Sequence, residues 1–412
     1  MKLNLASVRS LGGVFAFLLL LSPAVFGQAP TGTLSKFTLK SEVLGEERTI
    51  LVRTPPGYDT NSRKYPVLYM TDGDAQIGHT GSTIEFLARN GRISELIVVG
   101  ITNTDRTRDL TPTHVTTSAA STGGTPQFPT SGGADKFLKF IESELIPDIE
   151  KRYRVQPYRI LAGHSFGGLF AIHAMLSRPE LFNSYVAVSP SLQWDDELLV
   201  KRAAEFFKAR KEFKATLFVS LGNEPGPIGA SFVDFKKLLA GTNVKGFDWQ
   251  AEQLTDEDHG SVVLRSHYIG LRKIYEGWQL PRDPQTGAFA GDLKSADEHY
   301  KWLSQKFGYT IVTPENVINQ LGYQSLQGGK ADEAIAIFKS NVERYPESAN
   351  VYDSLAEAYE RNGRIDLAAP LYEKAQTLGQ QNSDPNYAIY KANFERASDK
   401  LKQAEAAKKN QK

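Results

Sequence analysis

Residues 159–176, RILAGHSFGGLFAIHAML, limit the fold of this chain more than any other stretch. An apolar run of strand character leads into Gly163, His164, Ser165, Phe166 and Gly167, and a segment typical of a helix follows. A strand, Gly-x-Ser-x-Gly and a helix, in that order, form the context of a nucleophile elbow. The glycines keep side chains out of the tight turn, and the helix N-terminus favours developing negative charge. The pattern therefore indicates that Ser165 is a nucleophile, and the alternative is a glycine-rich turn of an ordinary α/β protein.

Strand-like and helix-like segments alternate around this turn, from residue 34 to residue 293. Two runs at 37–44 and 47–55 are typical of an opening antiparallel pair, and residues 134–153 have apolar positions at helical spacing. Apolar runs of buried-strand length lie at 65–72 and 95–102, and four more strands are expected at 158–164, 184–190, 215–222 and 247–254. This alternation predicts an α/β fold with a doubly wound, mostly parallel sheet and helices on both faces. In such a sheet the ligand site lies at the carboxyl ends of the strands.

The first 27 residues have the features of a signal peptide. Lys2 and Arg9 precede the short apolar run VFAFLLLLSPAVF, and small residues place a cleavage site after Gly27. That run is too short to span a bilayer comfortably. We expect a periplasmic or secreted protein with no membrane span after signal removal. The sequence contains no cysteine, which excludes disulfides, thiol catalysis and a lipid anchor on cysteine.

The length and net charge of the chain bear on the number of domains and on the class of partner. A chain of 412 residues indicates two domains. The net charge of +1 predicts neither a nucleic-acid partner nor binding to an anionic membrane surface. We expect the first domain to be residues 28–293 and a second, helical region to be residues 294–412.

An internal repeat marks that helical region. Residues 315–348 and 349–382 align at an offset of 34, a period that resembles the tetratricopeptide repeat. Two such repeats are too few to be stable alone, so we expect them to pack on the first domain or on a protein partner, with a capping helix near 386–408. The aligned pairs are Leu321 with Leu355, Ala334 with Ala368, and Phe338 with Tyr372.

A nucleophilic serine needs a base and an orienting acid, which in this fold follow it in the order acid, then histidine. Glu224 ends the second strand after Ser165, and His259 follows the next strand. A carboxylate within 256–258 is the alternative acid. A metal site built from Asp256, Asp258 and His259 is a further alternative, although no matching ligand set appears elsewhere.

An acyl-transfer site also needs amide donors for the oxyanion. Phe166 N–H directly follows the serine, and Asp74 N–H lies in the loop after the strand at 65–72. His79, a few residues later, either faces the cleft or caps a helix.

Four motifs in order, YPVLYMTDGD, DRTRDLTPT, residues 132–155 and AGHSFGGLFAIHAM, resemble the Putative esterase family. That family includes enterochelin and salmochelin esterases and esterase D. The resemblance implies an α/β-hydrolase fold and a triad of Ser165, Glu224 and His259. It also implies that Arg106 and Arg108 help to hold an anionic substrate, and the alternative is a salt bridge with Asp105 or Asp109.

The sequence therefore predicts a carboxylic ester hydrolase that needs no cofactor and no metal. A siderophore lactone is the leading substrate, and short acyl or aryl esters fit as well. Two alternatives stay open: an acyltransferase with the same triad, and a non-catalytic binding protein that acts through its helical repeats.

Overall fold

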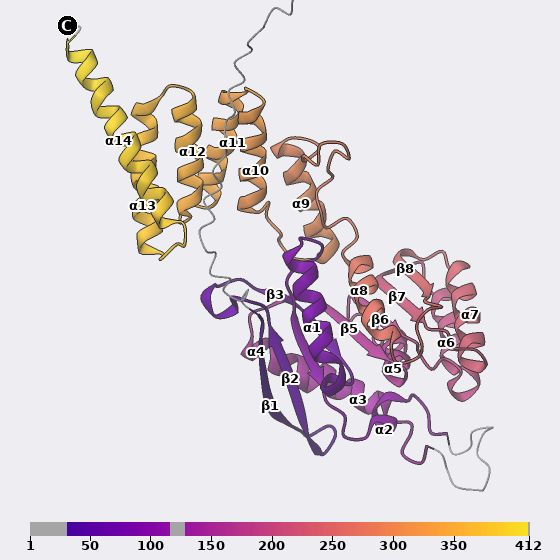
Figure 1. Ribbon diagram of the computed structural model, residues 1–412. Coiled ribbons are helices and arrows are strands. Elements are labelled where there is room, and N and C mark those ends of the chain that lie inside the picture. Colours follow the sequence, from indigo (N-terminus) through magenta and orange to yellow (C-terminus); the bar gives the residue numbers. More distant parts are fainter. Residues whose placement is uncertain (1–30, 116–127, 411–412) are drawn as a thin grey trace, which may run out of the picture.

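The computed structural model describes residues 31–115 and 128–410. Its first part is a sheet of eight strands in the order β1-β2-β4-β3-β5-β6-β7-β8, covered by helices on both faces (Figure 1). β1 pairs antiparallel with β2, β2 pairs antiparallel with β4, and all other pairs are parallel. The expected α/β class and the mostly parallel sheet are confirmed. The strands are β1 Thr33–Ser41, β2 Glu46–Thr54, β3 Tyr65–Met70, β4 Ile97–Ile101, β5 Val155–His164, β6 Ser184–Val188, β7 Glu212–Leu221 and β8 Lys245–Gln253.

The central strands are apolar on both faces because each face is covered by helices. In β3 every residue is buried, and alternate side chains enter two separate cores. Val67 and Tyr69 join one core, whereas Leu68 and Met70 join the other. One core packs against α1 (Gly73–Arg89) and α8 (Val262–Ile274). The other packs against α3 (Ala134–Phe140), η2 (Ile141–Leu145), α4 (Ile146–Arg152), α5 (Phe166–Ser177), α6 (Trp194–Lys208) and α7 (Pro227–Ala240).

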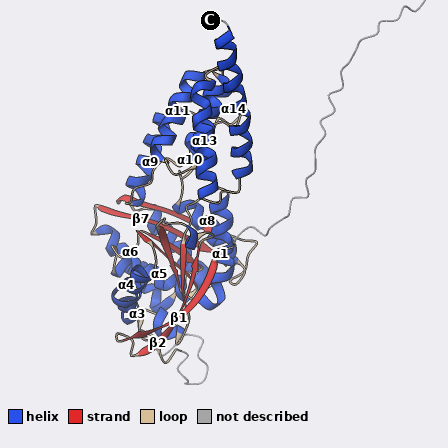
Figure 2. Cartoon of the chain, turned by 90° about the vertical axis from the view of Figure 1, so that its left-hand side faces the viewer, coloured by secondary structure: helices blue, strands red, loops and turns tan. Residues whose placement is uncertain are grey.

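The second part of the structure is entirely helical and extends from one end of the sheet (Figures 1 and 2). α12 begins at Ala349, 34 residues after α10 begins at Glu315, and α13 follows α11 at the same offset. Gly322 shows why small residues recur here, since a Cβ atom at that position would lie 2.4 Å from the ring of Phe338. The assignment to the tetratricopeptide class and the domain boundaries stay predictions. The helices are α9 Leu293–Phe307, α10 Glu315–Gln327, α11 Ala331–Arg344, α12 Ala349–Arg361, α13 Ile365–Gln381 and α14 Tyr387–Asn410.

The helical part shares a hydrophobic core with the sheet. Phe307, at the end of α9, is 2% exposed, and its ring centroid lies 4.9 Å from that of Tyr158 and 4.9 Å from that of Tyr275. Tyr158 lies near the amino end of β5, and Ser165 follows the carboxyl end of the same strand. The six residues between them span about 20 Å of strand. The helical part is therefore attached at the edge of the sheet opposite Ser165.

The expected signal peptide, residues 1–27, lies outside the described residues. Among the residues that are described, no helix is both long enough and apolar enough to cross a membrane.

Candidate active site

Ser165 occupies a strained turn between β5 and α5. Its backbone has φ 61° and ψ −117°, a conformation that a residue with a side chain rarely adopts. A Cβ atom at Gly163 would lie 2.2 Å from the carbonyl oxygen of Gly167, and one at Gly167 would lie 2.2 Å from Thr71 Oγ1. Both glycines are therefore required by close packing, and the turn leaves the serine at the carboxyl edge of the sheet.

Glu224 and His259 come from the loops after β7 and β8 and meet beside this turn. His259 Nδ1 lies 2.5 Å from Glu224 Oε2. The other carboxylate oxygen of Glu224 accepts from Ser189 Oγ at 2.6 Å and from Gly222 N–H at 3.1 Å. Glu224 is 9% exposed, whereas the His259 side chain is 44% exposed. A buried, hydrogen-bonded carboxylate at Nδ1 fixes the proton there, which leaves Nε2 free to act as a base.

The three acidic residues next to His259 in sequence make other contacts. Asp256 pairs with Arg265 at 2.5 Å, and Glu257 pairs with the same guanidinium at 3.1 Å. Asp258 Oδ1 accepts from the N–H groups of Gly260 and Ser261, so this side chain caps the loop that leads into α8. These contacts assign the three carboxylates to the loop and leave Glu224 as the carboxylate on the His259 ring.

His164, the residue before the serine, contacts the loop that carries His259. Its Nε2 atom lies 2.7 Å from the carbonyl oxygen of His259, and the two ring centroids are 4.6 Å apart. Burial, together with the neighbouring His259, lowers the pKa of His164 to about 4. A neutral ring therefore donates to that carbonyl at pH 7. The position of His164 next to Ser165 is the sequence feature that points to this contact. It does not identify the partner, because His259 lies 95 residues away.

Two backbone amides near the serine have no acceptor in the backbone. Phe166 is the first residue of α5, and Asp74 is the second residue of α1. Within the described residues, neither N–H donates to a backbone carbonyl. The first turn of a helix leaves such donors free for a ligand, and its dipole favours an anion there.

The two arginines of the RTRDL segment, which forms α2 (Arg106–Leu110), are both paired with carboxylates. Arg108 contacts Glu46 at 2.7 Å and Asp109 at 2.8 Å. The hydrogen bond from Arg108 is the main reason that the pKa of Glu46 is lowered. Arg106 pairs with Asp72 at 2.6 Å, a partner that sequence reasoning did not identify.

His79 lies in α1 and lines a groove of about 820 Å³ between α1 and α8. Its ring stacks on His267, with centroids 5.8 Å apart, and burial lowers the pKa of His79. The lining of this groove includes none of Ser165, Glu224 and His259.

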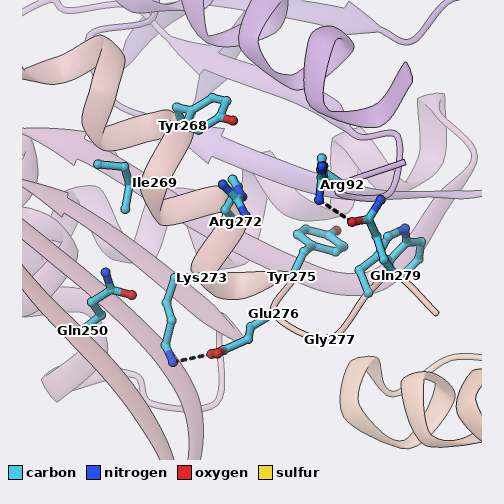
Figure 3. A pocket seen from close by; sticks show the side chains of 11 residues that line it. Arg92, Gln250, Tyr268, Ile269, Arg272, Lys273, Tyr275, Glu276, Gly277 and Gln279 are labelled. Atoms are coloured by element: carbon cyan, nitrogen blue, oxygen red, sulfur yellow. Dashed lines mark hydrogen bonds and ion pairs between the residues drawn. The ribbon is translucent and has the colours of Figure 1, made fainter. Parts of the chain in front are cut away.

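A smaller pocket of about 370 Å³ lies at the end of α8 and also lacks the triad candidates (Figure 3). Lys273 contacts Glu276 at 2.7 Å, and Arg92 contacts Gln279 at 2.5 Å. Trp278 lines the pocket and packs on Phe307 of α9. The pocket therefore belongs to the junction with the helical part.

Two aromatic rings pack against Phe166, the residue after Ser165. The ring of Phe166 lies 5.3 Å from that of Trp194 and 5.8 Å from that of Phe128. Trp194 is followed by Asp195, Asp196 and Glu197, whose φ angles of 51°, 52° and 59° are left-handed. Each such residue costs about 1–2 kcal/mol, and strain of this kind is typical of functional sites.

The chain is similar in sequence to several known proteins. The family model described as Putative esterase matches residues 41–230. Ferri-bacillibactin esterase BesA of Bacillus subtilis is 30% identical over 159 residues, which are 36% of this chain and 55% of that protein. A siderophore enterobactin esterase of Emericella nidulans is 29% identical over 245 residues, 50% of this chain and 80% of that one. The match thus spans about half of the first relative and four fifths of the second.

Among solved structures, an IroE-like serine hydrolase from Shewanella oneidensis superposes with a TM-score of 0.63 at 30% identity. The match covers 76% of this chain and 100% of that chain.

Proposed function

Because the chain belongs to the Putative esterase family, we propose that it is an exported serine esterase that hydrolyses a carboxylic ester through an acyl-enzyme on Ser165. The observation that carries this proposal is the contact between Glu224 and His259 beside the strained serine turn. The three residues follow β5, β7 and β8, in the chain order serine, acid, histidine that the triad has in this fold.

The reaction would proceed in two steps, formation of the acyl-enzyme and its hydrolysis. His259 Nε2 takes the proton of Ser165 Oγ as the oxygen attacks the ester carbonyl. The amides of Phe166 and Asp74 hold the oxyanion, and His259 returns the proton to the departing alcohol. Water then loses a proton to the same nitrogen and attacks the acyl-enzyme. As the bond between the acyl group and Ser165 Oγ breaks, His259 gives that proton to Oγ, and the carboxylic acid leaves.

A siderophore lactone is the substrate we favour. The names of the Bacillus and Emericella relatives support this choice, and so does the aromatic cluster of Phe166, Trp194 and Phe128, which can pack against an aryl group. Contacts between the substrate and Arg106, Arg108 or His79 stay predictions. The positive charge of each arginine is already matched by a carboxylate in this structure. Export with cleavage after Gly27 also belongs to the proposal, and intact-mass analysis of the exported protein tests it.

The test of the catalytic proposal is hydrolysis of p-nitrophenyl acetate by the purified protein and by Ser165→Ala. We expect turnover by the wild type and a loss of about 10³-fold or more in the variant. Ser143→Ala is the matched control, because Ser143 is exposed and bonds only within its own helical segment. An inactive wild type, or a Ser165→Ala variant within tenfold of it, would contradict the proposal.

A further inference from the structure

Arg106 contacts three parts of the candidate site at once. Its Nε lies 2.6 Å from Asp72 Oδ1, and its Nη2 lies 3.1 Å from Asp72 Oδ2 and 2.9 Å from the carbonyl oxygen of His164. The guanidinium carbon also lies 5.5 Å from the centroid of the Phe166 ring. The guanidinium thus joins the start of α1 to the residues before and after Ser165.

Asp72 stands where an aspartate usually caps a helix, but its carboxylate pairs with an arginine instead. It is the N-cap residue of α1, with a left-handed φ of 54°. An N-cap aspartate normally accepts a hydrogen bond from the free amides of its own helix. Here the side chain makes no capping bond, and its oxygens instead accept from Arg106 and from Asn103 Nδ2 at 2.7 Å. The amides at the start of α1, including that of Asp74, are therefore left without the usual carboxylate.

The helix that carries Arg106 is itself firmly attached. Asp105 Oδ1 caps α2 by accepting from Arg108 N–H at 3.0 Å. Arg108 then contacts Glu46 at 2.7 Å, which ties α2 to the first residue of β2. The Arg106 side chain is 32% exposed and that of Asp72 is 7% exposed, so their ion pair is largely shielded from water. A shielded, bidentate pair on an anchored helix holds its geometry better than a surface pair does.

We propose that Arg106 is a positioning residue of the oxyanion site, which draws the Asp72 carboxylate away from the amides of α1 and neutralises its charge. The inference rests on the proposed function, because it concerns the same Asp74 and Phe166 amides. Without Arg106 the Asp72 carboxylate would be free to cap α1. It would then occupy the donors that the oxyanion needs and place a negative charge beside it.

The experiment compares Arg106→Gln, Asp72→Ala and the double variant on a neutral ester, p-nitrophenyl acetate, and on an anionic one, p-nitrophenyl succinate. We expect Arg106→Gln to lower kcat about 10²-fold on both esters, similar to the loss of one oxyanion donor. We expect Asp72→Ala to restore at least tenfold of that loss in the double variant, because alanine removes both the charge and the oxygen that would cap α1. Arg152→Gln is the control, since Arg152 forms a comparable pair with Asp148 at 2.6 Å on α4. Melting temperatures verify that each variant is folded.

An arginine that serves only to hold an anionic substrate would behave differently. Its loss would raise KM for the succinate ester alone, and Asp72→Ala would rescue nothing. That result, or an Arg106→Gln variant with wild-type kcat on both esters, overturns the inference while the proposed function stands. A crystal structure of Arg106→Gln provides a readout that needs no activity. The Asp72 carboxylate should lie against the first amides of α1, and an unchanged carboxylate would overturn the inference even if the wild type hydrolyses no ester.

Discussion

His164 Nε2 donates a hydrogen bond to the backbone oxygen of His259 over 2.7 Å, so the residue before the serine holds the loop of the candidate base. This hydrogen bond can form in either protonation state of the ring, and burial lowers the pKa of His164 to about 4, so the ring is neutral at pH 7. The ionisable groups near the ring are His259, Asp72 and Arg106. Because burial disfavours the charged ring in the folded state, His164 links the stability of the fold to pH.

The first prediction concerns that link. An unfolded His164 has a pKa of about 6.5 and binds a proton more readily than the folded one. The unfolded state therefore binds more protons between about pH 4 and pH 6.5, and stability falls as the pH decreases through that window. Other histidines whose pKa is lowered, such as His267, act in the same direction.

The variant His164→Phe separates the contribution of His164 from theirs. Between pH 7 and pH 4 the wild type should lose more unfolding free energy than the variant, by a difference on the order of 2 kcal/mol. Urea unfolding at a series of pH values measures both slopes. Equal slopes would mean that His164 titrates normally in the folded protein.

The second prediction concerns the orienting acid. Glu224→Gln should lower kcat about 10²-fold to 10⁴-fold, because an amide cannot stabilise the imidazolium or fix the tautomer as a carboxylate does. Asp258→Asn should stay within about threefold of the wild type, since asparagine keeps the oxygen that caps Gly260 and Ser261. Steady-state hydrolysis of p-nitrophenyl acetate measures kcat for both variants. A larger loss in Asp258→Asn than in Glu224→Gln would identify Asp258 as the orienting acid.

The third prediction concerns Ser189, which sequence reasoning missed. Its hydroxyl donates to Glu224 Oε1 at 2.6 Å, and a hydrogen bond to a charged group contributes about 1.5–3 kcal/mol. Ser189→Ala should lower kcat/KM about tenfold while Gly222 N–H continues to hold the carboxylate.

Ser220→Ala is the matched control for Ser189→Ala. Ser220 is also buried and bonds to another side chain, Ser266, at 2.8 Å, but it does not contact Glu224 through its hydroxyl. If both alanine variants lose activity equally, the effect of Ser189 is general packing and the positioning role is wrong.

The fourth prediction concerns the helical part. A chain that ends at Asp292 should still hydrolyse small esters, because Ser165, Glu224 and His259 all precede that point and lie at the opposite edge of the sheet. It should have a lower melting temperature, since removal of Phe307 exposes Tyr158 and Tyr275. Turnover and thermal unfolding of the shortened chain are the measurements. Unchanged stability with complete loss of activity would show that the helices shape the active site.

Local patterns in the sequence were enough for the sheet and the serine turn. Apolar runs predict the central strands β3, β4 and β6, because a strand buried on both faces must be apolar at every position. β1 begins at Thr33 and ends at Ser41 instead of covering the expected 37–44, since it is largely exposed and has no such pattern. The serine turn is equally local, since Gly163 and Gly167 are dictated by contacts within a few residues and by the neighbouring strand. Strand order also placed Glu224 and His259 at one edge of the sheet.

Contacts between distant residues decided the rest. Sequence spacing offered Asp105 and Asp109 as partners of the two arginines, and Asp109 does pair with Arg108. The other partners, Asp72 for Arg106 and Glu46 for Arg108, lie 34 and 62 residues away and follow from no local rule. The same holds for His164, whose partner His259 is set by the packing of β5 against the loop after β8. Propensity and periodicity report on a residue and its near neighbours, whereas a charge or a hydrogen-bond donor takes whichever partner the folded chain brings within about 3 Å. The sequence by itself therefore determined the elements and the edge of the site, and only the tertiary structure decided which side chains complete it.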